Sequence, residues 1–222
     1  MIGWTGLAAI VGLAATAQGA RVTIVALGDS TTAGTPGFQS PLEAPPDGRG
    51  DQTSQFAYWL MRAHPDWRVL NRGVNGERSD QIALRFDRDV IAHRPRVVIV
   101  VAGVNDVYQG RPVAHVTTAL RGIYDRAGAA GIRVVAGSII PYNTATPEQN
   151  AKMREINAWI QAEAARDANV TFVDTRRAVA SPDDQDRLAS SDDTLHPDAA
   201  GYRKMADAIA PVLEAVLRTP AG

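Results

Sequence analysis

Short runs of consecutive apolar residues recur along the chain, and most of them are rich in β-branched side chains. The runs cover residues 22–27, 97–101, 134–140 and 170–173, with a shorter one at 68–71. Strands that are apolar at every position, rather than at alternate ones, are typical of parallel sheets buried on both faces. The pattern therefore predicts five buried parallel strands.

Between these runs, apolar residues repeat at the three- and four-residue spacing of amphipathic helices. The stripes consist of Ile82, Phe86 and Val90; Val116, Leu120, Ile123 and Ala127; Met153, Ile156 and Ile160; and Tyr202, Met205, Ile209, Val212 and Val216. Residues 146–149 read Thr-Pro-Glu-Gln, which is typical of a helix N-terminus with a capping box and a proline in its first turn. We interpret the stripes as helix faces that pack on the sheet.

Strands that alternate with helices predict an α/β fold of three layers, in which helices cover both faces of a parallel sheet. Ligands of such sheets bind beyond the carboxyl ends of the strands, so the residues that follow each strand are the candidates for chemistry. Residues 35–52 are rich in proline and glycine and are predicted to form a long loop after the first strand. Loops of this length in compact domains are usually functional or mobile.

Composition limits the classes of protein that the chain can belong to. Its 222 residues correspond to one domain. It has 23 Lys and Arg against 24 Asp and Glu, and a formal net charge of −1 gives no electrostatic signature of a nucleic-acid partner. The absence of cysteine excludes disulfides, cysteine-ligated metals and a cysteine nucleophile. Any covalent catalysis would use Ser, Thr, Lys or a carboxylate.

The first 20 residues differ from the rest because they contain no Lys, Arg, Asp or Glu. An apolar run at 7–17 ends in Ala15-Thr16-Ala17, a small-x-small cleavage pattern, so residues 1–20 resemble a secretory signal peptide. This predicts a secreted or periplasmic protein, with a domain at residues 21–222; the alternative is an apolar N-terminal segment on a cytoplasmic domain. The run is shorter than the ~20 residues that span a bilayer, so no stable membrane anchor is predicted.

Four short polar motifs follow predicted strands or precede the last predicted helix. They are Gly28-Asp29-Ser30-Thr31, Gly73-Val74-Asn75-Gly76-Glu77, Gly103-Val104-Asn105-Asp106 and Asp193-Thr194-Leu195-His196-Pro197. Each motif alone is common in turns, since Gly, Asn and Asp favour turn positions. Their joint occurrence beside the ends of the strands predicts that they form one site.

The first and last motifs together contain the parts of an activated nucleophile. Ser30 lies at a strand-to-helix turn, but a serine is a weak nucleophile unless a base takes its proton. Of the four histidines, His64, His93 and His115 lie at predicted helix ends, and we interpret them as surface or capping residues. His196 differs because the carboxylate of Asp193, three residues earlier, can bind Nδ1 and stabilise the imidazolium.

The two middle motifs contain hydrogen-bond donors. Asn105 offers a side-chain amide, and Gly76 offers a backbone N–H that no side chain obstructs. With the N–H of Ser30 they provide three donors that could stabilise a developing oxyanion.

The joint pattern resembles the SGNH hydrolases, also known as GDSL-type esterases and lipases, over residues 22–217. The resemblance implies Ser30 as the nucleophile, His196 as the base and Asp193 as the orienting acid. It also implies an oxyanion hole of Ser30, Gly76 and Asn105, with Gly73 as the alternative register for the glycine. The chain departs from the family motif at Thr31, where the family has leucine, at a position past the nucleophile.

The resemblance also implies a flavodoxin-like five-stranded sheet and two-step acyl transfer to water, with neither a cofactor nor a metal. We expect pocket walls from residues 35–55, 108–112 and 141–146, with Asp29, Tyr108 and Tyr142 as substrate contacts. Because these segments contain few large apolar residues and no helical lid insertion, we expect short acyl groups or acetylated carbohydrates. Thioesterase or lysophospholipase activity is the alternative.

Three interpretations from other classes compete with an esterase. A phosphate-binding loop is disfavoured because the chain lacks both Gly-x-x-x-x-Gly-Lys-Ser/Thr and Gly-x-Gly-x-x-Gly. A non-catalytic binding domain on the same fold would not need Ser30, His196 and Asn105 together. The aspartates at 183–193 lack the central glycine and terminal glutamate of a calcium loop, so we interpret them as a solvated acidic loop.

Overall fold

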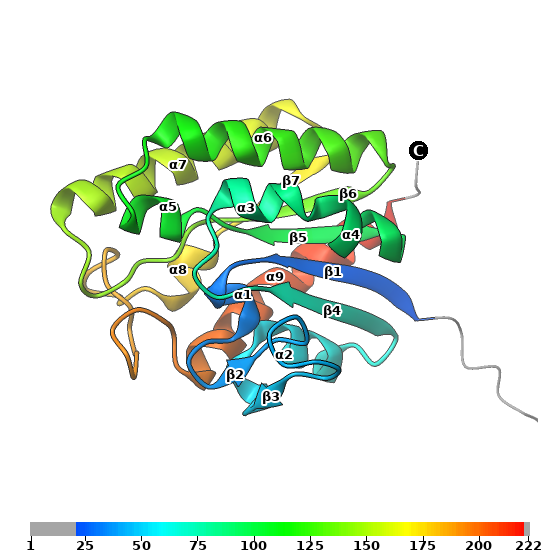
Figure 1. The fold of residues 1–222 in the computed structure, drawn as a ribbon, viewed down its shortest axis with the longest axis horizontal. Coiled ribbons are helices and arrows are strands. Elements are labelled where there is room, and N and C mark those ends of the chain that lie inside the picture. The colour runs from blue at the N-terminus through cyan, green and yellow to red at the C-terminus, as the bar shows by residue number, and fades with distance from the viewer. Residues whose placement is uncertain (1–20, 220–222) are drawn as a thin grey trace, which may run out of the picture.

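The computed structural model describes residues 21–219, so the predicted signal peptide at 1–20 lies outside the described residues. Five parallel strands form one sheet in the order β4-β1-β5-β6-β7 (Figure 1). The strands are β1 (Val22–Gly28), β4 (Trp67–Gly73), β5 (Val97–Val101), β6 (Arg133–Gly137) and β7 (Val170–Val173). This is the flavodoxin-like order, so the predicted fold class is confirmed.

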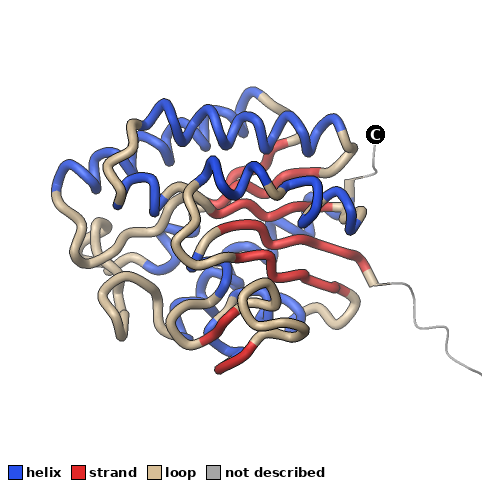
Figure 2. Tube along the Cα trace, in the orientation of Figure 1, coloured by secondary structure: helices blue, strands red, loops and turns tan. Residues whose placement is uncertain are grey.

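Helices cover both faces of the sheet (Figures 1 and 2). One face packs against α3 (Ser79–Leu84), α4 (Phe86–Asp89), α5 (Val104–Tyr108), α6 (Val113–Ala129) and α7 (Pro147–Arg166). The other packs against α2 (Phe56–Ala63), α8 (Thr175–Val179) and α9 (Ala199–Arg218). No helix between residues 21 and 219 has the length and apolar character needed to cross a membrane.

Alternate residues of each strand enter two separate cores, which explains why the strands are apolar at every position. Val25 and Leu27 of β1 lie in the core beneath α3 to α7, whereas Ile24 and Ala26 lie in the core beneath α2, α8 and α9. All four side chains have 0% exposure. Burial on both faces holds the strand in place. The position of its carboxyl end, and of any side chain there, is therefore fixed relative to the sheet.

The predicted helical stripes are buried, with two differences. In the last stripe Val212 is only partly buried, and Leu213 occupies the core position instead. The stripe of Ile82, Phe86 and Val90 does not form one helix. It is divided into α3, α4 and a 3₁₀ turn at Ile91–His93, with the first break at Arg85. The side chain of Arg85 is itself buried, which an uninterrupted amphipathic pattern does not predict.

The predicted strand at 134–140 is too long, because β6 ends at Gly137. The side chain of Asn157 on α7 binds the main chain of Ile139 at both polar groups. Its Oδ1 accepts from the Ile139 N–H at 2.7 Å and its Nδ2 donates to the Ile139 carbonyl at 2.9 Å. These bonds replace strand partners, so residues 138–140 leave the sheet as a loop.

The proline- and glycine-rich segment is folded rather than open. It begins after α1 (Ser30–Ala33) and contains the antiparallel pair β2 (Phe38–Gln39) and β3 (Arg49–Gly50), followed by a 3₁₀ turn at Gln52–Ser54. Phe38 is 4% exposed. The segment is bonded to the loop after β4, since Ser40 Oγ donates to the Gly73 carbonyl at 2.6 Å and Glu43 Oε1 accepts from the Asn75 N–H at 2.8 Å.

The predicted capping box at the start of α7 is present and can be tested by substitution. Thr146 Oγ1 accepts from the Gln149 N–H at 3.2 Å, and Gln149 Oε1 accepts from the Thr146 N–H at 2.9 Å. Loss of an N-cap hydroxyl costs about 1 kcal/mol, so Thr146→Ala should lower the free energy of unfolding by that amount in urea titrations. Thr118→Ala, at an exposed interior position of α6, is the control and should leave stability unchanged or raise it. Equal effects of the two substitutions would contradict a capping role.

Candidate active site

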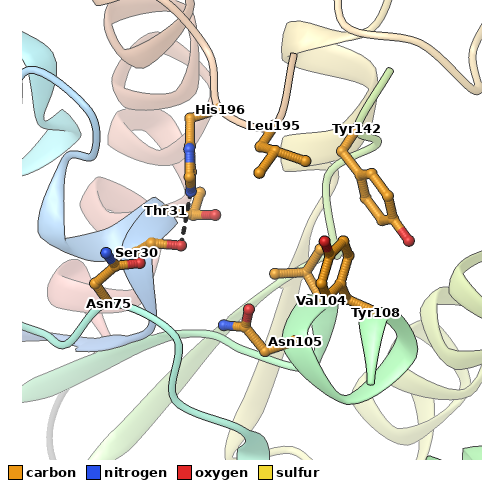
Figure 3. Close-up of a pocket in the computed structure, with 9 residues that line it drawn as sticks. All are labelled: Ser30, Thr31, Asn75, Val104, Asn105, Tyr108, Tyr142, Leu195 and His196. Carbon is orange, nitrogen blue, oxygen red and sulfur yellow. Dashed lines mark hydrogen bonds between the residues drawn. The ribbon is translucent and has the colours of Figure 1, made fainter. Parts of the chain in front are cut away.

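The first and last motifs meet at the carboxyl edge of the sheet. Ser30 is the first residue of α1, directly after β1, and His196 lies in the loop before α9. Ser30 Oγ lies 2.8 Å from His196 Nε2, and His196 Nδ1 lies 2.6 Å from Asp193 Oδ2 (Figure 3 shows the first of these bonds). The three side chains predicted as nucleophile, base and orienting acid are thus joined in one chain of hydrogen bonds.

Asp193 is held so that one oxygen faces the imidazole. Its Oδ1 accepts from the backbone N–H groups of Leu195 and His196 at 2.9 and 2.8 Å, which leaves Oδ2 for Nδ1. Partial burial raises the pKa of Asp193, but the hydrogen bonds from the His196 ring and from the two backbone groups outweigh it, and the net pKa is lowered. An ionised Asp193 accepts from Nδ1–H, so Nε2 is the nitrogen free to accept the proton of Ser30.

The loop that carries Asp193 and His196 has irregular backbone and is bonded to the loop after β6. Thr194 adopts a left-handed conformation, with φ of 69°, and its carbonyl accepts from the Asn143 N–H at 2.7 Å. Asn143 Oδ1 also accepts from the Leu188 N–H at 2.8 Å. Asn143 therefore holds the acid–base loop at two points, and no motif in the sequence marks it for this role.

Each of the three predicted oxyanion donors has an N–H without an acceptor among the described residues. Among the bonds of residues 21–219, none uses the N–H of Ser30 or of Gly76. Asn105 lines the cavity, and its Nδ2 donates to the Glu77 carbonyl at 2.9 Å, which leaves a second proton on the same nitrogen. Gly76 is exposed and has φ of 78°, a conformation that glycine adopts without strain.

The geometry disfavours Gly73, the alternative glycine of the second motif. Its N–H already donates to Asn71 Oδ1 at 3.0 Å. A Cβ on this residue would lie 2.1 Å from the backbone nitrogen of Ala33. Gly73 is therefore a packing residue where β4 meets α1, and Gly76 is the glycine of this motif whose N–H has no protein partner among the described residues.

A cavity of about 160 Å³ lies beside Ser30, Asn105 and His196, and Gly76 is not among the residues that line it. It is lined by Ser30, Thr31, Asn75, Val104, Asn105, Tyr108, Tyr142, Leu195 and His196 (Figure 3). The wall includes four residues that the sequence did not predict for it, each next to a predicted site residue within a motif: Thr31, Asn75, Val104 and Leu195. The predicted contribution of residues 35–55 to the wall is wrong for this cavity, because that segment packs against the loop after β4 instead.

Tyr108 and Tyr142 both line the cavity, where sequence reasoning expected them. Their rings meet edge to face with centroids 5.9 Å apart. Tyr108 is 59% exposed, whereas Tyr142 is 2% exposed and its hydroxyl points away from Ser30 (Figure 3). Burial raises the pKa of Tyr142 to about 12, with a smaller effect of Tyr108. Tyr142 therefore offers a neutral ring, and not a hydroxyl, to a bound molecule.

The prediction that Asp29 contacts the substrate is wrong, because its side chain has 0% exposure. Asp29 is the N-cap of α1, and its Oδ1 accepts from the Thr31 N–H at 3.0 Å. Burial raises the pKa of Asp29 to about 7, against the hydrogen bonds from Thr31. Its function in this structure is to set the turn that presents Ser30.

Two other groups of ionisable side chains lie outside the cavity. Asp80, Asp106 and His115 place potential ligand atoms within 4.8 Å of one another, but Asp80 is paired with Arg78 and Asp106 accepts from the N–H and Oγ of Ser79. In the acidic stretch at 183–193, Asp186 pairs with Arg154 and Arg176. Because these carboxylates are already paired with guanidinium or hydroxyl donors, we interpret both groups as structural.

Known proteins were compared with the chain and its structure. The sequence model of the GDSL-like lipase/acylhydrolase family matches residues 26–204. An acetylxylan esterase from Geobacillus stearothermophilus is 27% identical, over 74% of this chain and 84% of that protein.

Solved structures share the fold. A member of the lipolytic protein G-D-S-L family from Veillonella parvula superposes with a TM-score of 0.72 at 20% identity, over 89% of this chain and all of that one. A psychrotrophic esterase from Pseudoalteromonas gives a TM-score of 0.67 at 19% identity, over 89% of this chain and 99% of that one. The family match covers most of the chain, and the predicted resemblance is confirmed. The chain belongs to the GDSL-like lipase/acylhydrolase family and is a serine esterase.

Proposed function

We propose that this esterase hydrolyses short-chain carboxylic esters, acetyl esters of carbohydrates among them, through an acyl-enzyme intermediate on Ser30. The observation that carries the proposal is the hydrogen-bonded chain Ser30–His196–Asp193 at a cavity that Asn105 also lines. The N–H groups of Ser30 and Gly76 and one proton of Asn105 Nδ2 have no acceptor among the described residues. A serine attached to a base needs such donors, because the step that it performs places negative charge on the substrate oxygen.

In the first half of the reaction, Ser30 Oγ attacks the ester carbonyl carbon while its proton passes to His196 Nε2. The carbonyl oxygen becomes an oxyanion, which accepts from the N–H groups of Ser30 and Gly76 and from Asn105 Nδ2. Asp193 stabilises the imidazolium. When the tetrahedral intermediate collapses, the bond to the alcohol oxygen breaks and His196 donates the proton to the departing alkoxide.

In the second half, water attacks the acyl-enzyme carbonyl and His196 Nε2 takes one of its protons. The same three donors hold the second oxyanion. The bond to Ser30 Oγ then breaks, and His196 returns the proton to the serine as the acid leaves. The two halves use the same groups in reverse order, so one arrangement of donors serves both transition states.

The size of the cavity supports a short acyl group. A volume of about 160 Å³ is smaller than the ~300–1,000 Å³ of pockets that enclose drug-sized ligands. Its apolar wall comes from Val104, Tyr142 and Leu195, while Tyr108 stands at the exposed rim. We assign the closed part to the acyl group and the rim to the alcohol, where an exposed aromatic ring can stack on a sugar. The related acetylxylan esterase supports a carbohydrate alcohol.

Removal of the nucleophile should abolish catalysis without unfolding the protein. Ser30→Ala should lose p-nitrophenyl acetate hydrolysis and labelling by a fluorophosphonate probe, while the melting temperature stays close to that of the wild type. Ser181→Ala removes a hydroxyl outside the cavity and should keep both activity and labelling. Residual burst kinetics in Ser30→Ala would show that another residue is acylated.

Removal of one oxyanion donor should slow the chemical step. Asn105→Ala is expected to lower kcat by ~10²-fold, the usual effect of losing one such donor. KM should change little, because the donor acts mainly on the charge that develops in the transition state. Thermal melts will report any cost of losing the bond to the Glu77 carbonyl. An unchanged kcat in a folded variant would remove Asn105 from the oxyanion hole.

Acyl length should determine the rate. In a series of p-nitrophenyl esters from acetate to dodecanoate, kcat/KM should be highest at two to four carbons and fall steadily beyond them, since the cavity cannot enclose longer chains. Peracetylated xylose and an acetylated xylo-oligosaccharide test the carbohydrate part of the proposal by acetate release. A maximum at the long-chain esters would overturn the assignment of the cavity to a short acyl group.

A further inference from the structure

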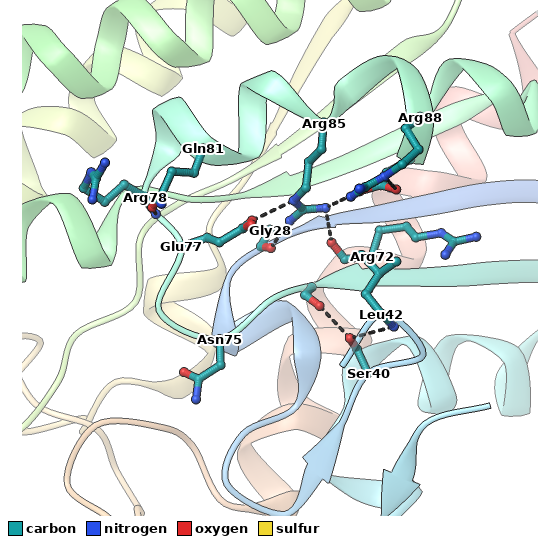
Figure 4. A network of polar contacts seen from close by, with 12 residues as sticks. Gly28, Ser40, Leu42, Arg72, Asn75, Glu77, Arg78, Gln81, Arg85 and Arg88 are labelled. Atoms are coloured by element: carbon teal, nitrogen blue, oxygen red, sulfur yellow. Dashed lines mark hydrogen bonds and ion pairs between the residues drawn. The ribbon is translucent and has the colours of Figure 1, made fainter. Parts of the chain in front are cut away.

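The guanidinium of Arg85 lies against the carboxyl ends of two neighbouring strands (Figure 4). Its Nη2 donates to the carbonyl of Gly28, the last residue of β1, at 2.8 Å. Its Nη1 donates to the carbonyl of Arg72 near the end of β4 at 2.9 Å. The side chain is 7% exposed, so Arg85 joins the two strands from inside the protein.

Arg85 also binds two carboxylates that differ in their surroundings. Asp89 is 2% exposed, accepts from Nη1 at 2.9 Å and is bound by Arg88 as well. Glu77 is 21% exposed, and its Oε2 accepts from Nε at 2.6 Å. The buried charge of Arg85 therefore has a buried partner in Asp89. The second partner, Glu77, lies in the loop between β4 and α3, outside the strands and helices.

Glu77 is the residue at which two of the proposed oxyanion donors meet. It directly follows Gly76, so a shift of Glu77 moves the chain on one side of that glycine. Its carbonyl accepts from Asn105 Nδ2 at 2.9 Å, which fixes the orientation of that amide. The loop's own turn is weakly closed, because the Glu77 N–H reaches the Val74 carbonyl at 3.4 Å. The side-chain bond to Arg85 is the shorter attachment of Glu77 to the body of the protein.

We propose that the Glu77–Arg85 ion pair is a positioning device for the oxyanion hole. The carbonyls at the ends of β1 and β4 hold Arg85 in place, and Ser30 follows β1 in the chain. Arg85 in turn holds Glu77, which adjoins Gly76 and binds Asn105. The positions of all three donors then depend on one buried guanidinium. Neither side chain lines the cavity, so both are positioning residues. The inference rests on the proposed roles of Gly76 and Asn105.

A purely structural role would have a different signature. Arg85 is buried, so removal of the Glu77 carboxylate leaves its Nε–H without that acceptor and should lower the melting temperature whichever role is correct. A positioning role also predicts a slower reaction, because a donor displaced by ~1 Å can lower the rate by as much as 10²-fold. The two roles therefore predict different values of kcat for the variant and similar melting temperatures.

Glu77→Ala should lower kcat for p-nitrophenyl acetate by about 10-fold or more while KM stays near the wild-type value. Glu77→Gln keeps an oxygen that can accept from Arg85 Nε, so its loss should be smaller. Asp87→Asn is the control: it removes one carboxylate charge from an exposed ion pair with Arg126, away from the loop. It should keep the wild-type kcat. Arg85→Lys should resemble Glu77→Ala in kcat, since one ammonium cannot reach all four acceptors.

Two further measurements decide the mechanism. The affinity for a boronic acid, which forms a tetrahedral adduct on a serine, should weaken in step with kcat/KM across the Glu77 variants. A crystal structure of Glu77→Ala should show the Gly76 nitrogen displaced relative to Ser30 Oγ. The inference is overturned if folded Glu77→Ala and Glu77→Gln keep the wild-type kcat, if only KM rises, or if the Gly76 nitrogen does not move. Absence of ester hydrolysis in the wild type would instead refute the proposed function, and the crystal structure would still decide the positioning role.

Discussion

Backbone polar groups at the carboxyl ends of the strands lose their sheet partners at the point where the functional loops begin, and buried groups of this kind must be paired. Side chains meet this requirement here. Arg85 binds the Gly28 and Arg72 carbonyls, Asn71 binds the Gly73 N–H, and Asn157 binds both polar groups of Ile139. The side chains that bind the ends of the strands thus also hold the loops around Ser30 in place. The site is therefore anchored to the strands.

The two halves of the site depend on this edge to different degrees. Ser30 and the loop of the proposed oxyanion donors lie within a few residues of β1, β4 and β5, and the Val74 N–H of that loop donates to the Gly28 carbonyl of β1 at 3.1 Å. The acid and base lie in irregular backbone between α8 and α9, and that segment is attached through Asn143 and through the pairing of Asp186 with Arg176. The bond of 2.8 Å between Ser30 Oγ and His196 Nε2 joins these two parts of the site.

Much of the fold and of the site could be predicted from the sequence, because the signals were local. Strands buried on both faces are apolar throughout, and Ser30, Asn105 and His196 follow strands or precede a helix within short motifs. Long-range partners gave no such signal. The end of β6 depends on Asn157, 18 residues away in sequence, and the bond from Arg85 to Gly28 spans 57 residues. Asp29 adjoins Ser30 in sequence and is nevertheless buried, because adjacency does not reveal on which side of a turn a carboxyl lies.

Tyr108 is exposed at the rim of the cavity, so folding and the proposed binding of the substrate place different requirements on this residue. Most of its ring is in solvent, and its protein neighbour at the rim is Tyr142. A replacement there removes little buried surface, so the stability of the domain places almost no restriction on this position. With the rim assigned to the alcohol as proposed above, substitution of this one residue could change the alcohol that the enzyme accepts, while the strand ends and their buried partners remain under selection for folding and chemistry together.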